Sequence, residues 1–238
     1  MLKKLLERGV EEVIVREHLE AELKAGKKLR IKFGIDPTSP DLHLGHTVPL
    51  RKLRQFQDFG HKAVLIIGDY TARIGDPSGR DKKRIALTSA EIEANMANYL
   101  QQATKIIDVA SAEVRYNSEW YNKMSFPDIL ALLSKFTAQQ ILERDDFHKR
   151  IENHKPLWMN ELLYPALQAH DSVVIRADVE LGGTDQKFNL LAGRSLMESL
   201  KMPPQDIITL PLLVGTDGTA KMSKSLDNYI GITEEANI

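Results

Sequence analysis

The chain has 238 residues, of which 42% are hydrophobic and 27% are charged, and its formal net charge is -1. This length suits one large α/β domain with a sizeable core, and the charge balance argues against a protein whose whole surface binds nucleic acid. The absence of cysteine excludes disulfides and thiolate metal sites, and no segment reads as a signal peptide or a membrane span, so we expect a soluble, cytoplasmic protein with no membrane or DNA partner.

In the first half of the chain, helices and strands are predicted to alternate. Apolar residues recur every three or four positions near the N-terminus, which predicts a helix over residues 1–25. The continuous apolar run at 63–68 is typical of a strand buried on both faces of a parallel sheet. The other elements predicted here are a strand over 29–35 and helices over 47–59 and 88–107.

The second half begins with a less regular stretch, residues 111–160, which is predicted to be a mostly helical insertion. After it we predict a helix over 162–170, a strand over 172–177, a helix over 185–201 and a strand over 207–214. Strands that alternate with helices predict an α/β fold with a doubly wound, Rossmann-like parallel sheet.

Three loops rich in polar residues follow predicted strands, at 36–46, 69–80 and 182–187. In doubly wound sheets, ligands bind beyond the carboxyl ends of the strands. The three loops are therefore expected to meet at one edge of the sheet and to form one site.

The first of these loops contains His43-Leu44-Gly45-His46, at or just before the start of a helix. Free backbone N–H groups and the helix dipole favour anions there, and two imidazoles three residues apart can face one phosphate. Gly45 lets a nucleotide approach the backbone. A His-x-x-His metal site and two unrelated histidines in a turn remain as alternatives.

A second motif, Lys221-Met222-Ser223-Lys224-Ser225, follows the last predicted strand. Two lysines and two hydroxyls on a flexible loop suit a polyphosphate that must be clamped and then released. A lysine provides a point charge that can follow a moving phosphate. A merely solvated lysine-serine loop is the alternative.

Together the two motifs resemble the signature pair of class I aminoacyl-tRNA synthetases, with Leu44 as a conservative departure in the first motif. Their order and separation fit the smallest members, those for tyrosine and tryptophan. The spacing Tyr164, Gln168, Asp171 resembles the tyrosine-binding helix of the tyrosyl enzymes.

Two further segments, 33–38 and 182–186, also resemble their counterparts in bacterial tyrosyl-tRNA synthetases. The resemblance covers essentially the whole chain. Lys32 departs from it, because many bacterial relatives have a tyrosine there that contacts the substrate phenol, and Glu180 stands where many have glutamine. The phenol contact therefore depends mainly on Asp171.

The resemblance implies that the chain activates L-tyrosine with ATP and transfers the tyrosyl group to tRNA(Tyr). By resemblance, the catalytic residues are Thr38, His43, His46, Lys221 and Lys224. The tyrosine-binding residues are Gly34, Asp36, Thr71, Asp76, Tyr164, Gln168, Asp171 and Gln186. The ATP-binding residues are Gly45, His46, Gly183, Asp185, Leu212, Lys221, Met222, Ser223 and Lys224.

The same resemblance implies Mg²⁺ bound with the ATP phosphates and a homodimer that docks through the 111–160 insertion, and the sequence itself shows no dedicated metal ligand. Trp120, Phe126 and Phe136 are candidates for that interface, with core packing as the alternative. Arg80, Lys82 and Lys83 are candidates for contacts to pyrophosphate or to the tRNA acceptor end.

The implied organisation is a nucleotide-binding catalytic domain over 1–215, then a mobile lysine-serine loop and the start of a linker over 216–238. An anticodon-binding C-terminal domain, which the resemblance leads us to expect, is absent from the chain. Rival functions are a tryptophanyl-tRNA synthetase, a nucleotidylyltransferase and a non-catalytic RNA-binding paralogue of a synthetase.

Overall fold

The computed structural model describes residues 1–77 and 87–235. These residues form one six-stranded sheet in the order β1-β6-β5-β2-β3-β4. All neighbouring strands are parallel except β1, which lies antiparallel to β6. The strands are β1 (Glu12–Ile14), β2 (Arg30–Ile35), β3 (Lys62–Ile67), β4 (Glu113–Tyr116), β5 (Val179–Gly183) and β6 (Asp206–Leu210).

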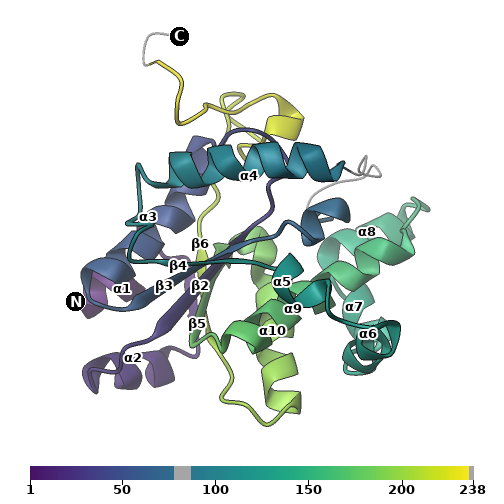
Figure 1. Cartoon of the computed structure of the whole chain (residues 1–238), viewed down its shortest axis with the longest axis horizontal. Coiled ribbons are helices and arrows are strands. Elements are labelled where there is room, and N and C mark those ends of the chain that lie inside the picture. The colour runs from purple at the N-terminus through teal and green to yellow at the C-terminus, as the bar shows by residue number, and fades with distance from the viewer. Residues whose placement is uncertain (78–86, 236–238) are drawn as a thin grey trace.

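Helices cover both faces of this sheet, as Figure 1 shows. The helices of the first half are α1 (Leu2–Leu6), α2 (Arg16–Lys24), α3 (Leu44–Asp58) and α4 (Ser89–Ala103). Those of the second half are α5 (Ser118–Tyr121), α6 (Phe126–Leu133), α7 (Ala138–Leu142), α8 (Asp145–Glu152), α9 (Met159–Ile175) and α10 (Lys187–Ser199). The predicted α/β doubly wound fold with a helical insertion is confirmed.

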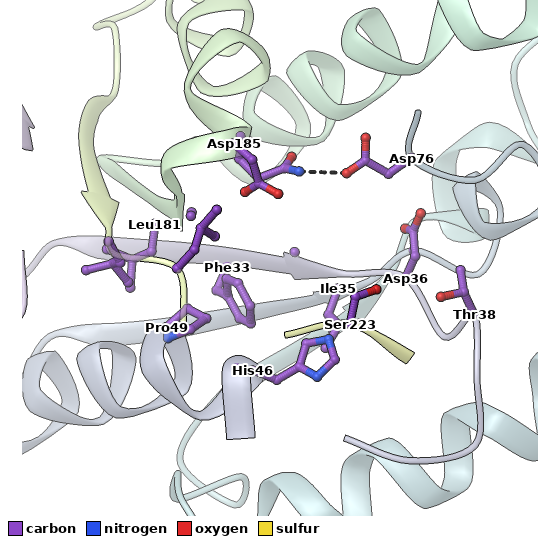
Figure 2. A pocket seen from close by; sticks show the side chains of 18 of the residues that line it. Phe33, Ile35, Asp36, Thr38, His46, Pro49, Asp76, Leu181, Asp185 and Ser223 are labelled. Carbon is purple, nitrogen blue, oxygen red and sulfur yellow. Dashed lines mark hydrogen bonds between the residues drawn. The ribbon is translucent and has the colours of Figure 1, made fainter. Parts of the chain in front are cut away.

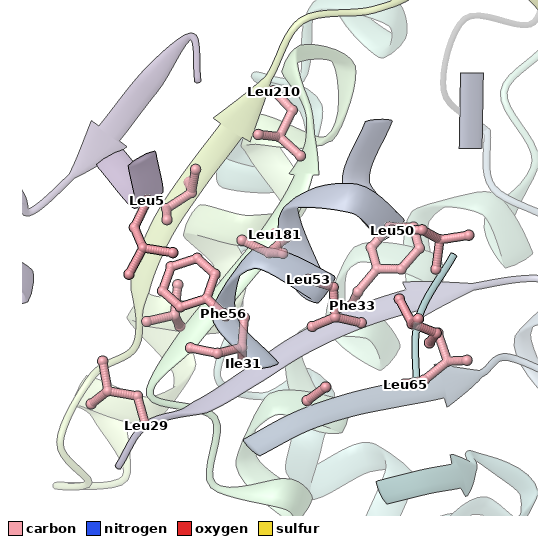
Figure 3. Packing of buried hydrophobic residues seen from close by; sticks show 14 of the residues in the cluster. Leu5, Leu29, Ile31, Phe33, Leu50, Leu53, Phe56, Leu65, Leu181 and Leu210 are labelled. Carbon is pink, nitrogen blue, oxygen red and sulfur yellow. The ribbon is translucent and has the colours of Figure 1, made fainter. Parts of the chain in front are cut away.

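Side chains alternate between the two faces along each strand, which gives the sheet two separate cores. On β3, Leu65 packs with α1–α4 in one core, and Val64 and Ile66 pack with α5, α6, α9 and α10 in the other. Figure 3 shows Leu50, Leu53 and Phe56 of α3 over strands β2, β5 and β6 in the first core. Both cores exclude water, so the polar groups that remain buried between them need partners.

The structure differs from the predicted elements at several places, the first of which is the N-terminus. Residues 1–25 form two short helices separated by β1 instead of one helix. Gly9, with φ +64°, follows α1, and residues 12–14 then pair with the edge of β6. Pairing with a neighbouring strand overrode the helical spacing of the apolar residues.

The predicted strand over 172–177 is also wrong, because these residues are the end of α9 and the turn after it. The helix continues to Ile175 and ends at Arg176 in a left-handed conformation, φ 52°. A short apolar run is compatible with either a buried helix or a strand. The strand proper is β5, and Gly182 and Gly183 are its last residues.

The insertion begins with a strand that was not predicted. Strand β4 pairs in parallel with β3 and forms the edge of the sheet, before helices α5–α8. It is short and only partly buried, so it lacks the continuous apolar run that marked β3. Within the described residues, no helix combines the length and the apolar character that crossing a membrane requires.

Candidate functional site

A cavity of about 310 Å³ opens at the carboxyl ends of β2, β5 and β6. Strands β2 and β5 are neighbours in the sheet, yet the chain winds away from them in opposite directions, and such a switch point is where doubly wound sheets bind ligands. Every residue to which the sequence analysis assigned a catalytic, tyrosine-binding or ATP-binding role lines this cavity. The structure therefore brings the predicted residues together, and their separate roles stay predictions.

Figure 2 shows two groups in this cavity, with His46 on one side of Phe33 in the view and Asp76 and Asp185 on the other. The histidine side lies at the start of α3. His43 is the N-terminal cap of that helix, and the centroids of the His43 and His46 rings are 3.8 Å apart. The N-terminus of α3 thus points two adjacent imidazoles, inclined to each other by 37°, into the cavity.

Backbone hydrogen bonds fix the tautomer of both imidazoles. The N–H of His43 donates to Nδ1 of His46 at 3.1 Å, and the N–H of Gly45 donates to Nδ1 of His43 at 3.1 Å. Burial, and secondarily the Lys224 ammonium, lower the pKa of His43 to about 4, and burial also lowers the pKa of His46 well below its usual value. Both rings are therefore neutral near pH 7, with Nδ1 accepting and Nε2 carrying the proton. Each offers an N–H donor.

The residue at position 45 has to be a glycine. A Cβ on Gly45 would lie 2.9 Å from Cε1 and Nδ1 of the His43 ring. A side chain there would displace the His43 ring from its capping position at the start of α3. The neutral, donating geometry of the pair therefore depends on this glycine.

The lysine loop covers the same cavity from the side of β6. The Lys221 ammonium donates to Oδ2 of Asp185 at 2.6 Å, and Lys224 lies 3.8 Å from Oδ2 of Asp41 and over the Tyr229 ring. The backbone N–H of Met222 donates to the carbonyl of Leu213 at 2.7 Å. The loop is thus closed over the strand end instead of extending into solvent.

The segment after the lysine loop pairs with the segment that contains the histidines. Leu44 N–H donates to the carbonyl of Ile230 at 2.9 Å, and Ile232 N–H donates to the carbonyl of Leu42 at 3.0 Å. His43 and Gly231 form an antiparallel bridge. Main-chain hydrogen bonds therefore join the histidine motif to the segment that follows the lysine motif.

A second polar cluster in the cavity is centred on Asp36. The Tyr164 hydroxyl donates to Oδ2 of Asp36 at 3.0 Å, and the Thr71 hydroxyl donates to Oδ1 at 2.8 Å. A Cβ at Gly68 would lie 2.0 Å from Oδ1 of Asp36, so only glycine fits there. Sequence reasoning did not single out Gly68, although its place at the end of an apolar strand was visible.

A chain of amides connects the remaining predicted tyrosine contacts. Gln186 donates to Oδ2 of Asp76 at 2.6 Å, and Asn189 donates to Oε1 of Gln186 at 3.1 Å and to Oε1 of Gln168 at 2.9 Å. Arg144, only 4% exposed, lies 3.4 Å from Oδ1 of Asp76. Asn189 and Arg144 were not predicted, because no motif marked them.

Asp171 is buried and accepts hydrogen bonds from three side chains. Trp120 Nε1 and the Tyr121 hydroxyl donate to Oδ1, both at 3.0 Å, and Asn117 Nδ2 donates to Oδ2 at 3.4 Å. Burial raises the pKa of Asp171 from 3.8 to about 6, against the opposing effects of the Lys32 ammonium and these hydrogen bonds. All three donors follow β4, the strand that was not predicted, and they were missed with it.

Lys32 and Glu180 form an ion pair beneath Asp171 and Gln168. Lys32 Nζ lies 2.7 Å from Oε1 of Glu180, and the two side chains are 0% and 1% exposed. The same ammonium donates to the Gln168 carbonyl at 2.9 Å and to the Ser172 hydroxyl at 2.7 Å. All three ammonium protons are therefore used within the protein, and Lys32 supports the floor of the cavity without a free donor.

The remaining residues that the sequence analysis singled out are found as follows. Trp120 is buried and its Nε1 donates to Asp171, which favours the alternative of core packing, whereas Phe126 on α6 is 72% exposed and Phe136 is half-buried. Arg80, Lys82 and Lys83 lie outside the described residues. Over residues 1–77 and 87–235, no group of three or more His, Cys, Asp or Glu side chains could hold a metal ion.

Comparison with known proteins gives a consistent set of relatives. The family of class I tRNA synthetases for tryptophan and tyrosine matches residues 24–238. The tyrosine–tRNA ligase of Dehalococcoides mccartyi strain 195 is 57% identical over 234 residues, covering 98% of this chain and 59% of the relative. That of Xylella fastidiosa strain Temecula1 is 55% identical over 230 residues, covering 97% of this chain and 55% of the relative.

Solved structures of this kind share the fold. The tyrosyl-tRNA synthetase of Archaeoglobus fulgidus, in complex with L-tyrosine, matches with a TM-score of 0.80 at 26% identity and covers 98% of this chain and 70% of that one. A C-terminally truncated mitochondrial tyrosyl-tRNA synthetase of Coccidioides posadasii matches with a TM-score of 0.78 at 27% identity, covering 93% and 69% of the two chains. The present chain spans less than two thirds of the length of the curated relatives above.

Proposed function

The chain belongs to the class I tRNA synthetases for tryptophan and tyrosine, and we propose on that basis that it activates L-tyrosine with ATP and transfers the tyrosyl group to tRNA(Tyr). One observation carries the proposal. A single cavity is lined by two imidazole donors, two lysines and a buried carboxylate, Asp171. The phosphates of ATP need hydrogen-bond donors and positive charge, and the phenol hydroxyl of tyrosine needs a buried acceptor.

In the first step, an oxygen of the tyrosine carboxylate forms a bond to the α-phosphorus of ATP. The bond from that phosphorus to the bridging oxygen breaks, and pyrophosphate leaves. A free amino-acid carboxylate has a pKa of about 3.5 and needs no general base near neutral pH. The neutral His43 and His46 therefore act as N–H donors to phosphate oxygens as negative charge develops, with Thr38 beside them.

The lysine loop would clamp the leaving pyrophosphate. Lys221 and Lys224 already flank the cavity, and each is paired with a carboxylate, Asp185 or Asp41. Asp185 is also the proposed acceptor for the ribose hydroxyls, so ribose and Lys221 compete for one carboxylate. Binding of ATP then frees the Lys221 ammonium for the phosphates.

Tyrosine is held by its two ends in this proposal. Asp76, Tyr164 and Gln168 take the ammonium group, and Asp171 accepts from the phenol hydroxyl. Mg²⁺ enters with the phosphates of ATP, and the described residues contribute no cluster of three or more His, Cys, Asp or Glu side chains to hold it. The proposed location is the cytoplasm, where tRNA is charged.

The proposal extends to a homodimer that docks through the helices after β4. Phe126 and Leu130 on α6 are 72% and 51% exposed, which is unusual for large apolar side chains and typical of a covered surface. Sedimentation of the chain should give the dimer mass. A Phe126→Asp variant should sediment as a monomer if this surface is the interface.

Tyrosine-dependent exchange of pyrophosphate into ATP tests the proposed function. The chain should catalyse exchange with tyrosine and not with phenylalanine or tryptophan. Exchange that is driven by tryptophan would favour the tryptophan branch of the family. The absence of exchange with any amino acid would favour a non-catalytic paralogue.

Replacing Asp171 with asparagine should weaken the preference for tyrosine over phenylalanine by about tenfold. A hydrogen bond to a charged acceptor contributes ~1.5–3 kcal/mol and one between neutral groups ~0.5–1.5 kcal/mol, so the loss of charge removes about one factor of ten. Asparagine keeps an oxygen for Trp120 and Tyr121, which preserves the packing. The measurement is the ratio of kcat/KM for the two amino acids in the exchange assay, and an unchanged ratio would contradict the phenol assignment.

Tyrosine affinity should fall as the pH drops below about 6. The pKa of Asp171 is raised to about 6, so its carboxylate is charged above this pH and protonated below it. Protonation weakens the acceptor for the phenol, whereas it favours the folded state, because the folded pKa exceeds the unfolded one. Equilibrium binding of tyrosine from pH 5 to pH 8 measures the effect. Phenylalanine lacks the hydroxyl and serves as the control, so the tyrosine-to-phenylalanine affinity ratio should change with pH.

A further inference from the structure

Asn228 is a buried amide that connects the parts of the lysine loop. It is 2% exposed, although it follows a loop whose other residues lie largely at the surface. Its Oδ1 accepts from the Ser223 N–H at 2.8 Å, and its Nδ2 donates to Oδ2 of Asp217 at 2.7 Å and to the Lys221 carbonyl at 3.1 Å. Both functional atoms of the amide are therefore used, and all the partners belong to the loop.

The main chain around Asn228 is shaped to admit this side chain. The Thr216 N–H donates to the Asn228 carbonyl at 2.9 Å. Gly215 is buried against the amide, and a Cβ there would lie 2.2 Å from Nδ2 of Asn228. The beginning of the loop thus has a glycine where Asn228 needs room and a backbone donor where it offers an acceptor.

Asp217 extends the arrangement to the tip of the loop. Its Oδ1 accepts from the backbone N–H groups of Thr219 and Ala220, at 2.9 and 3.0 Å, and its Oδ2 accepts from Asn228. Asp217 itself is exposed. One side chain therefore forms the turn before Lys221, and Asn228 fixes that turn to the segment after it.

We infer that Asn228 is a positioning residue that holds the lysine loop in one conformation and so presents Lys221 and Lys224 to the ATP phosphates. This inference rests on the proposed function, since it assigns the two lysines to phosphate. The Lys221 carbonyl and the Ser223 N–H, on either side of Met222, are both held by this amide. Residues 230–232, shortly after Asn228, pair with the segment of His43, so the loop that Asn228 holds continues directly into that pairing.

An Asn228→Ala variant should lower kcat/KM for ATP in tyrosine-dependent exchange by about ten- to a hundredfold, because a loop that samples many conformations presents the lysines for only part of the time. The dissociation constant for tyrosine should stay within about twofold of the parent value, since tyrosine binds at the far end of the cavity. Thr216→Ala serves as the matched control. It removes an exposed hydroxyl from the same loop and should leave both constants unchanged.

A reciprocal exchange of side chains sharpens the test. Asn228→Asp places a second carboxylate against Asp217 and the Lys221 carbonyl and should be as harmful as alanine. Adding Asp217→Asn restores a donor and acceptor pair between the two positions, and the new amide oxygen can still accept from Thr219 and Ala220. The double variant should therefore have a higher kcat/KM for ATP than Asn228→Asp, although the Lys221 carbonyl still faces an acceptor at position 228.

Amide hydrogen exchange gives a readout that does not require activity. In Asn228→Ala, exchange of the peptide over 213–228 should accelerate about tenfold or more, while peptides of β5 and β6 keep the parent rates. Parent exchange rates over 213–228 would overturn the inference. The inference would also be overturned if Asn228→Ala lost as much affinity for tyrosine as it lost in kcat/KM for ATP. A double variant whose kcat/KM for ATP is no higher than that of Asn228→Asp would overturn it as well. If the parent chain shows no pyrophosphate exchange, the proposed function fails, and hydrogen exchange still decides the role of Asn228 in the loop.

Discussion

A His46→Ala variant should catalyse pyrophosphate exchange about a hundred- to a thousandfold more slowly than the parent chain and still bind tyrosine. The neutral ring of His46 donates from Nε2, because its Nδ1 accepts from the backbone of His43. Removing one preorganised donor to a developing negative charge typically costs ~2.7–4 kcal/mol of transition-state stabilisation. Steady-state exchange rates and equilibrium binding of tyrosine measure the two effects separately.

Two matched variants separate this catalytic loss from a loss of structure. His46 also caps α3, and glutamine is the usual residue at this position of a capping box, so His46→Gln should keep the stability of the helix start. The His148 side chain on α8 is 64% exposed and is not part of the cavity lining, and His148→Ala should exchange at the parent rate. A His46→Ala variant with near-normal exchange would rule out the donor role.

A Lys32→Met variant should lower the free energy of unfolding by about 3–5 kcal/mol. The change leaves Glu180 buried without its ammonium, and breaking one side of a buried ion pair is costly for that reason. Urea unfolding monitored by circular dichroism measures the loss. The KM for tyrosine should rise as well, since Lys32 holds the carbonyl of Gln168 at the floor of the cavity.

The double variant Lys32→Met/Glu180→Gln tests whether the two charges are coupled. It removes both charges and keeps an amide that can accept from Ser172 and contact Gln205. Its free energy of unfolding should therefore exceed that of Lys32→Met alone by at least about 1 kcal/mol. A double variant destabilised by the sum of the two single changes would mean that the pair is not coupled.

The sequence predicted the fold and the cavity lining better than it predicted what lies behind the lining. The motif residues sit at strand and helix ends, where periodicity and turn chemistry are informative. By contrast, Asn117, Trp120 and Tyr121 contact Asp171 only because β4 adds to the sheet edge, and β4 is too short and too exposed to show an apolar pattern. Residues that act through long-range contacts carry no local signal.

Lys32 illustrates the same limit at a single position. A lysine in the middle of a strand predicts a solvent-facing side chain, but here it lies on the face of β2 that α9 covers. Its partner Glu180 is on the adjacent strand β5, and β2 and β5 are far apart in the chain. Lys32 and Glu180 are two positions at which the sequence departs from the family pattern. Only the order of the strands in the sheet reveals that their opposite charges compensate each other.

The main-chain pairing of residues 42–44 with residues 230–232 has a consequence for biosynthesis. These segments are separated by nearly the whole chain, and such contacts form only after a long loop has closed. A ribosome releases the N-terminal half first, so the sheet and its two cores can assemble while the histidine segment still lacks its partner. A nascent chain can therefore complete the main-chain pairing beside His43 only after residues 230–232 have left the ribosome.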